Sequence, residues 1–307
     1  MQRRRFLSAL AAGAAALSAP TIPAKSPESD ELEQYDLRLD GDPKLARRAL
    51  LFVPKHVVKS SRLPLLVLLH GLGETGNELS GIHAWGDLYG LVRAYERLRR
   101  PPVRPTLEQQ RYLLPERAAE INALVKERPF GGLVLVCPVT PNPYKPGPAS
   151  RTLDRYADWI QKSLLPAARE AAKKSSAAIG IERIGLDGCS LGGYVGIEVF
   201  LRKPELFATI GGVQSAFSVP AALGYAKEIA RALKRVGPRA IHVETSSLDP
   251  YRKSNDALAR RLRELGVEVE LRVPPGPHDQ PWLREIGTLE MLLYQDRKLR
   301  QAKIETG

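Results

Sequence analysis

Residues 183–202 read RIGLDGCSLGGYVGIEVFLR, and the order of apolar, glycine and polar residues in this stretch is the strongest indication of the fold. The apolar run at its start is typical of a buried strand, and Tyr194–Arg202 is typical of a helix. Between them, Gly-x-Ser-x-Gly centred on Ser190 is typical of a strained turn that lifts a serine hydroxyl above the edge of a sheet. We therefore expect Ser190 to be a nucleophile, with the backbone N–H of Leu191 facing the oxygen of the reacting carbonyl.

A serine hydroxyl needs a neighbouring base, and the base needs a carboxylate to orient it; after such a turn the acid precedes the histidine along the chain. Only His242 and His278 follow Ser190. His242 lies within an apolar, strand-like run and is interpreted as a core residue, whereas His278 lies in a proline- and glycine-rich loop after a predicted strand. Asp249 lies in a loop after the preceding strand. The sequence thus predicts His278 as the base and Asp249 as the acid, in preference to Asp256 in the next helix.

The loop after an earlier apolar run is expected to supply a second hydrogen-bond donor. HGLG at residues 70–73 follows that run, and the backbone N–H of Leu72 would join that of Leu191 in binding an oxyanion. Gly71–Gly76 also matches Gly-x-Gly-x-x-Gly, a pattern of dinucleotide-binding proteins, so an oxidoreductase is a competing interpretation. Against it, the motif follows the third predicted strand, and no strand ending in an acidic residue follows about 20 residues later. We expect no cofactor and no metal ion.

Strand-like and helical patterns alternate along the chain, which predicts an α/β fold. We expect one domain over residues 34–307, built on a mostly parallel, eight-stranded sheet with helices on both faces. Helical patterns cover 222–236 and 255–265 and stop at Gly237 and Gly266. The predicted strands are Gln34–Leu39, Arg48–Val53, Leu65–His70, Leu133–Cys137, Arg183–Asp187, Thr209–Val213, Ala240–Glu244 and Val267–Val273.

A long segment between His70 and Leu133 interrupts this alternation, because a crossover between parallel strands needs far fewer residues. Two helical patterns separated by prolines predict a helical insert over residues 88–128, rich in basic residues. The segment leaves the sheet from the carboxyl end of a strand, so the insert forms either a lid over the site or a peripheral cover. Trp85 and Trp282 are expected to offer apolar contacts to a substrate.

The amino-terminal residues are typical of an export signal. RRRFL at residues 3–7 precedes a short run rich in alanine and leucine, which predicts a twin-arginine signal peptide over residues 1–24. A polar segment, 25–33, is expected to be a flexible linker. No apolar run is long enough to span a bilayer, and no cysteine follows the signal for lipid attachment, so we expect no stable membrane anchor. The predicted location is the periplasm or the exterior of a bacterium.

The chain of 307 residues carries a formal net charge of +12 and two cysteines, Cys137 and Cys189. The predicted strands keep the two cysteines apart, so we expect two thiols rather than a disulfide. The basic excess is interpreted either as an aid to solubility or as an attraction to acidic substrates. No nucleic-acid recognition motif accompanies it, so we expect no nucleic-acid partner.

Four stretches of the sequence resemble the esterase D-like branch of the α/β hydrolases. That branch includes feruloyl and acetylxylan esterases, polyhydroxybutyrate depolymerase-like enzymes and siderophore esterases. The stretches are HGLGE at 70–74, GCSLGGY at 188–194, SLDPYRKSNDALARRLRELGVEVEL at 247–271 and PGPHDQPW at 275–282. The resemblance spans residues 34–295 and departs from the branch at the basic insert.

The resemblance implies an α/β-hydrolase fold and a serine esterase that cleaves a small or polymeric carboxylic ester through an acyl-enzyme. Ser190, Asp249 and His278 match the catalytic triad of the branch, and Leu72 and Leu191 match its oxyanion positions. Acyltransferases share this branch, so acyl transfer to an alcohol is an alternative to hydrolysis. A non-catalytic binding protein on the same scaffold is a second alternative, which labelling by a fluorophosphonate would distinguish from an enzyme.

Overall fold

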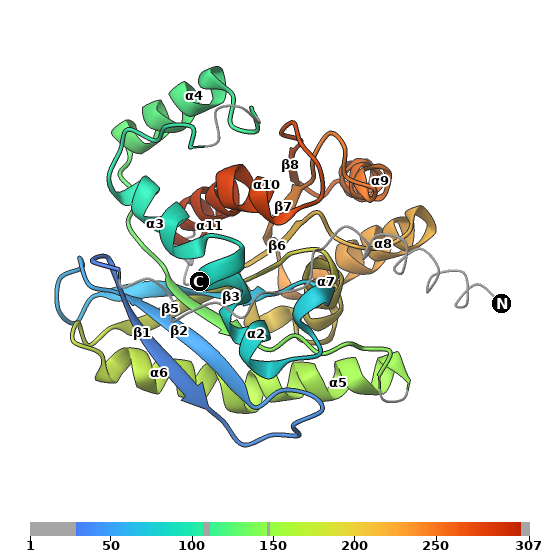
Figure 1. Ribbon diagram of the computed structural model, residues 1–307. Helices are drawn as coiled ribbons and strands as arrows, with labels where there is room; N and C mark the ends of the chain where they lie inside the picture. The colour runs from blue at the N-terminus through green and yellow to red at the C-terminus, as the bar shows by residue number, and fades with distance from the viewer. Residues whose placement is uncertain (1–28, 107–110, 146–147, 302–307) are drawn as a thin grey trace.

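The computed structural model describes residues 29–106, 111–145 and 148–301, and the predicted signal peptide, 1–24, lies outside them. The fold is built on an eight-stranded sheet (Figure 1). Its strands are β1 (Leu32–Arg38), β2 (Arg48–Pro54), β3 (Arg62–Leu69), β4 (Val134–Pro138), β5 (Gly180–Gly188), β6 (Thr209–Val213), β7 (Ala240–Glu244) and β8 (Glu270–Arg272). Their order is β1-β2-β4-β3-β5-β6-β7-β8. Strands β3 to β8 run parallel, while β1 and β2 form an antiparallel edge, so the prediction of a mostly parallel sheet is confirmed.

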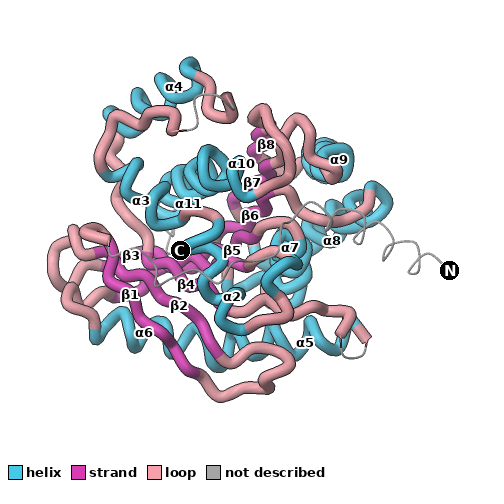
Figure 2. Tube along the Cα trace, in the orientation of Figure 1, coloured by secondary structure: helices cyan, strands magenta, loops and turns pink. Residues whose placement is uncertain are grey.

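Helices cover both faces of this sheet, as predicted. The longer ones are α3 (Leu91–Arg99), α4 (Pro115–Glu127), α5 (Ala149–Trp159), α6 (Leu165–Lys174), α7 (Leu191–Arg202), α8 (Val219–Val236), α9 (Arg252–Glu264) and α11 (Thr288–Gln301). Helices α5, α6 and α7 lie on one face, and α11 lies on the other with α3 beside it (Figures 1 and 2). Because both faces are covered, the inner strands are largely apolar, and every residue of β4 and β6 is buried.

The helices begin and end where local chemistry favours it. The hydroxyl of Ser218 accepts a hydrogen bond from the backbone N–H of Ala221 and so caps the first turn of α8. Gly237 ends α8 with a φ of 82°, and Gly266 follows α9 with a φ of 74°. Glycine adopts these positive φ angles without a steric penalty, so both predicted helix ends are confirmed.

The register of the parallel strands gathers several loops at one edge of the sheet. Leu69 at the end of β3 pairs with Gly188 at the end of β5, so the loop at 70–72 lies beside the turn at Ser190. Glu244 at the end of β7 pairs with Arg272 at the end of β8, and the loops that hold Asp249 and His278 follow these two strands. All the predicted polar site residues therefore leave the sheet at its carboxyl edge, where ligands bind in open α/β sheets.

The prediction of a flexible linker over residues 25–33 is wrong for its last part. Strand β1 already begins at Leu32, and the buried side chain of Glu31 accepts a hydrogen bond of 2.9 Å from Arg100. The Ser29 hydroxyl donates to Glu96 on α3 at 2.7 Å. Residues 29–33 read as polar, but the side chains of Ser29 and Glu31 find partners on the insert, and these contacts hold the two residues in place.

The predicted helical insert contains α3 and α4. Arg117 on α4 donates to Glu290 on α11 at 2.6 Å, and Arg297 on α11 donates to the carbonyl of Leu124 at 2.8 Å. Helix α3 packs beside α11, whereas α4 is joined to α11 by these arginine side chains, and in the described part of the chain no hydrogen bond or ion pair joins either helix to Ser190. For α3 and α4 these contacts favour a peripheral cover, whereas the start of the insert approaches the site, because Tyr89 Oη accepts from the N–H of Gly71.

Both cysteines are buried thiols, as predicted. Cys137 lies on β4 and Cys189 follows β5, with β3 between the two strands. Burial raises the pKa of both thiols well above their usual range, so neither is a ready nucleophile. Among the described helices, none has the length and apolar character that crossing a bilayer requires.

Candidate active site

The turn between β5 and α7 holds Ser190 in a conformation that is rare for a residue with a side chain. Its φ is 55° and its ψ is −115°. Such backbone strain costs about 1–3 kcal/mol and persists only where surrounding contacts impose it. Here the Ser190 N–H donates to the carbonyl of Val213, and the Ser190 carbonyl accepts from the N–H of Ala216, each at 2.9 Å. Strand β6 and its following loop therefore hold the turn in place.

The turn also depends on glycine at positions where backbones nearly touch. A methyl group added at Gly192 would lie 2.1 Å from the carbonyl oxygen of Leu69, and one at Gly188 would lie 2.4 Å from the backbone of Gly192. Both distances are far below van der Waals contact. The pattern Gly-x-Ser-x-Gly is therefore a steric requirement of the approach of α7 to β3 and β5.

Gly192→Ala is expected to lower the free energy of unfolding by about 1–3 kcal/mol, because the added methyl forces the backbone of the turn away from Leu69. It should also lower kcat, since the N–H of Leu191 moves with the turn. Gly224→Ala is the matched control: nothing lies within 4 Å of its added methyl inside α8, and alanine favours a helix by about 0.5–1 kcal/mol. Urea denaturation measures both variants, and equal stability of the two would contradict the steric argument.

Ser190, His278 and Asp249 form one continuous hydrogen-bonded chain. His278 Nε2 lies 3.1 Å from Ser190 Oγ, and His278 Nδ1 lies 2.9 Å from Asp249 Oδ1. Because a carboxylate only accepts, the proton between these two side chains sits on Nδ1. Nε2 then carries a lone pair directed at the serine hydroxyl, which is the arrangement that a general base requires.

The carboxylate of Asp249 is fixed by partners that the sequence did not indicate. Thr245 Oγ1 donates to Asp249 Oδ2 at 2.5 Å, and the N–H of Tyr251 donates to Oδ1 at 2.9 Å. The Tyr251 ring also meets the imidazole of His278 edge to face, with 5.6 Å between the centroids. Thr245 and Tyr251 flank Asp249 in the chain, but no motif marks them, so only the fold shows that they hold its carboxylate.

The loop that carries His278 is held from both sides. The carbonyl of Pro277 accepts hydrogen bonds from Gln214 at 2.9 Å and from Ser246 at 3.0 Å. On the other side, Asp279 caps the short helix α10 (Gln280–Trp282), where its carboxylate accepts from the Trp282 N–H at 2.8 Å. The imidazole thus projects from a rigid loop, although proline and glycine dominate the local sequence.

The two tryptophans predicted to contact substrate are fully buried, so this prediction is not supported. Both indole rings have 0% exposed surface. Trp85 packs against the ring of Tyr89, with 5.1 Å between centroids, and Trp282 donates from Nε1 to the carbonyl of Pro275 at 3.1 Å. Both rings pack within the protein beside loops near the site, and neither has a surface that a ligand could contact.

Leu72 and Leu191, the predicted oxyanion donors, each begin a helical turn. Leu191 is the first residue of α7, so its N–H has no partner within the helix. Leu72 begins η2 (Leu72–Glu74), a single 3-10 turn, which is much shorter than the helix that follows a dinucleotide fingerprint. A methyl group at Gly71 would lie 3.7 Å from Ser190 Cβ, so the two loops are in contact beside the serine.

His242 is a core residue, as the sequence indicated, and it belongs to a buried charge cluster on the sheet. Its imidazole lies 3.4 Å from Asp187 on β5 and 3.4 Å from Glu244 on β7. Strand β6 lies between them, and a methyl group at Gly211 would lie 1.9 Å from the Asp187 carboxylate. Burial acts to lower the pKa of His242, but the two carboxylates outweigh it and raise the pKa to about 10. A histidine that stays protonated does not act as a base at neutral pH.

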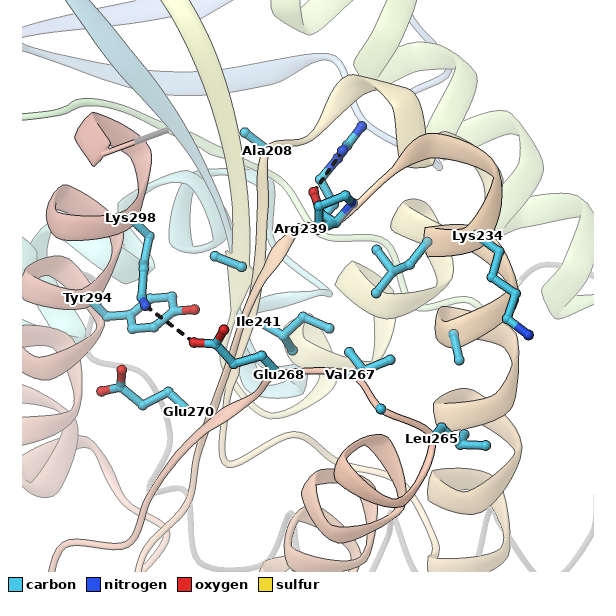
Figure 3. Close-up of a pocket in the computed structure, with 15 residues that line it drawn as sticks. Ala208, Lys234, Arg239, Ile241, Leu265, Val267, Glu268, Glu270, Tyr294 and Lys298 are labelled. Carbon is cyan, nitrogen blue, oxygen red and sulfur yellow. Dashed lines mark hydrogen bonds and ion pairs between the residues drawn. The ribbon is translucent and has the colours of Figure 1, made fainter. Parts of the chain in front are cut away.

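A cavity of about 600 Å³ lies at the amino ends of β6 and β7, opposite the sheet edge that holds Ser190. Figure 3 shows the residues that line it. Ala208, which precedes β6, and Ala240, which begins β7, line the cavity together with residues of α8. On one side, Lys298 Nζ lies 3.9 Å from Glu268 Oε1. The cavity is therefore separate from Ser190, which follows the carboxyl end of β5. Within the described ranges, no group of His, Cys, Asp and Glu residues has the arrangement of a metal site.

No protein-family model matches the sequence, and no curated protein does. Solved structures do match. One is a ferulic acid esterase, with a TM-score of 0.59 and 17% identity over 88% of this chain and 99% of that one. Another is carboxyl esterase 2 from the fungus Tuber melanosporum, with a TM-score of 0.54 and 16% identity over 97% and 98%. A third is S-formylglutathione hydrolase from Staphylococcus aureus, with a TM-score of 0.51 and 13% identity over 89% and 100%. The chain therefore has the α/β-hydrolase fold that these enzymes share.

Proposed function

We propose that this protein is a serine esterase that hydrolyses carboxylic esters. The observation that carries the proposal is the hydrogen-bonded chain from Ser190 through His278 to Asp249, with distances of 3.1 and 2.9 Å. It lies at the carboxyl edge of a parallel sheet, where open α/β folds bind ligands. The strained turn at the serine supports the same conclusion, because strain of this kind gathers at functional sites.

In the proposed reaction, His278 Nε2 takes the proton of Ser190 Oγ as the oxygen attacks the ester carbonyl. The N–H groups of Leu72 and Leu191 would bind the negative oxygen of the tetrahedral intermediate. Its collapse expels the alcohol, which receives the proton from His278, and leaves an acyl-enzyme. Water, deprotonated by the same histidine, then releases the carboxylic acid and restores the serine. Asp249 would hold the imidazole tautomer throughout.

A hydrolysis panel tests this proposal. p-Nitrophenyl esters of increasing chain length, methyl ferulate and an aliphatic polyester would define the acyl group and the size of the substrate. A fluorophosphonate probe should label the wild-type protein at Ser190, because a serine activated by a base attacks phosphorus as it attacks a carbonyl. If the protein neither hydrolyses any of these esters nor takes up the probe, it is not a serine esterase. A product ester formed when an alcohol is added would instead indicate acyl transfer.

We also propose export through the predicted twin-arginine signal peptide. Replacing Arg3 and Arg4 by lysine is expected to leave the precursor in the cytoplasm, because the export machinery reads the arginine pair as an address. Arg5→Lys is the matched control, since it changes the adjacent basic residue and leaves the pair intact. Fractionation followed by immunoblotting measures the location. Export of the double variant at the level of the control would indicate the general secretory route.

A further inference from the structure

A buried chain of hydrogen bonds holds the loop that carries the predicted oxyanion donor Leu72. The N–H of Gly71 donates to Tyr89 Oη at 3.1 Å, and the Tyr89 hydroxyl donates to Glu74 Oε2 at 2.7 Å. Tyr89 and Glu74 are each only 3% exposed. Burial raises the pKa of Tyr89 well above 10, so the phenol keeps the proton that it donates. The first peptide group of the loop, between residues 70 and 71, is thereby fixed.

His70 fixes the next peptide group from the other side. Its Nε2 accepts a hydrogen bond of 2.8 Å from the N–H of Thr140, so the ring proton lies on Nδ1 and is donated to the carbonyl of Gly71 at 2.9 Å. Burial lowers the pKa of His70 to about 4, so the imidazole is neutral. The Gly71 carbonyl and the Leu72 N–H belong to one planar, trans peptide group and point in opposite directions. Holding the carbonyl therefore sets the direction of the Leu72 N–H.

We propose that Tyr89, held by Glu74, is a positioning residue for the oxyanion hole. This inference rests on the proposed esterase function, because it needs an oxyanion for Leu72 to bind. Preorganised donors lower the barrier because they need not reorient when negative charge develops on the substrate oxygen. With Tyr89 and His70 on either side of Gly71, neither peptide group can rotate toward solvent. Gly71 fits this frame because even a methyl there would lie 3.0 Å from Tyr89 Oη.

The role proposed for the Tyr89 hydroxyl can be tested without disturbing the packing of the Tyr89 ring. The Tyr89 ring contacts Trp85 edge to face, with an interplanar angle of 82°. The Tyr89 carbonyl accepts a hydrogen bond of 2.7 Å from the hydroxyl of Thr288. Phenylalanine at position 89 would keep both contacts and remove only the oxygen between Gly71 and Glu74. Its effect on the reaction therefore reports on the orientation of the loop rather than on loss of the core.

The test compares Tyr89→Phe with Tyr95→Phe. Tyr95 is also fully buried, but its ring packs on Phe130 and its hydroxyl lies against Gly132, away from the oxyanion loop. Tyr89→Phe is expected to lower kcat for p-nitrophenyl acetate by about tenfold or more, while KM changes by less than about twofold. A trifluoromethyl ketone, which forms an oxyanion when Ser190 adds to it, should bind more weakly by the factor by which kcat/KM falls. Tyr95→Phe should leave kcat, KM and the affinity for the trifluoromethyl ketone unchanged.

Two further variants test Glu74 as the acceptor of the hydrogen bond from the Tyr89 hydroxyl. Glu74→Gln retains an oxygen for the Tyr89 proton and should keep most of kcat, whereas Glu74→Leu should lose as much as Tyr89→Phe does. Thermal unfolding of each variant shows whether the fold is intact. If Tyr89→Phe retains wild-type kcat, or loses no more than Tyr95→Phe, the inference is wrong although the esterase proposal stands. If the wild-type protein itself neither turns over esters nor takes up a fluorophosphonate, the proposed function fails instead.

Discussion

Ser190→Ala is expected to lower kcat for ester hydrolysis by about 10⁴-fold or more, and to abolish labelling by a fluorophosphonate. The reason is that His278 Nε2 loses the hydroxyl that lies 3.1 Å away, so no nucleophile remains for the base to activate. The variant should still fold, because alanine meets the same backbone strain as serine at a φ of 55° and the backbone hydrogen bonds to Val213 and Ala216 remain. A small residual rate is expected from the oxyanion donors alone.

Ser176→Ala is the control for this variant. Ser176 is exposed, and its hydroxyl donates to Glu33 on β1, at the far edge of the sheet from the turn. Steady-state kinetics should give wild-type values for Ser176→Ala and a rate near background for Ser190→Ala. Full activity without the Ser190 hydroxyl would exclude this residue as the nucleophile and with it the proposed mechanism.

Asp249→Asn is expected to lower kcat by about 10⁴-fold, by analogy with serine hydrolases in which the acid is replaced by its amide. The amide nitrogen can donate to His278 Nδ1, which the carboxylate cannot do. The imidazole would then carry its proton on Nε2, facing the serine, and could no longer accept the serine proton. The Thr245 hydroxyl would still have an amide oxygen to donate to, but the Tyr251 N–H would lose its acceptor at the Oδ1 position, which is expected to cost about 1–3 kcal/mol of stability.

Asp256→Asn is the informative comparison for that experiment. Asp256 lies on α9, seven residues further along the chain, where it is partly exposed and paired with Arg252 at 3.6 Å. It was the competing acid in the sequence, so its replacement should leave kcat near the wild-type value. A greater loss from Asp256→Asn than from Asp249→Asn would transfer the role of the acid to Asp256.

The fold was largely predictable because most strands are marked by short apolar runs between turn residues. The observed bounds of β6 and β7 are those predicted, and β8 is shorter than predicted because only Glu270–Arg272 pairs with β7. Helix α11 had no such signal. Its residues from Thr288 to Asp296 are all buried, and polar ones such as Glu290 and Asp296 bond to other parts of the chain, so no exposed polar face marks the period of the helix.

The candidate site was predictable where function imposes a motif and not where it depends on burial. Chain order and loop position were sufficient to select His278 and Asp249, and the structure brings both into hydrogen-bond distance of their expected neighbours. By contrast, no sequence motif around Trp85 or Tyr89 predicts which residues they contact. Tyr89 meets Gly71 across 18 residues of chain, and only the packing of the short helices between them creates that contact.

Gly211 on β6 limits which substitutions the buried charge cluster can accept. Because Gly211 has no side chain, Asp187 and His242 meet above a strand that would otherwise keep them apart. A larger residue at 211 would displace the aspartate, and His242 would then lose one of the two carboxylates that raise its pKa in the core. Positions 187, 211, 242 and 244 are therefore energetically coupled, so the effects of substitutions among them on stability are not expected to add. Replacing this cluster by apolar packing would require Asp187, His242 and Glu244 to be exchanged together, because any charge left alone in the core would be unpaired.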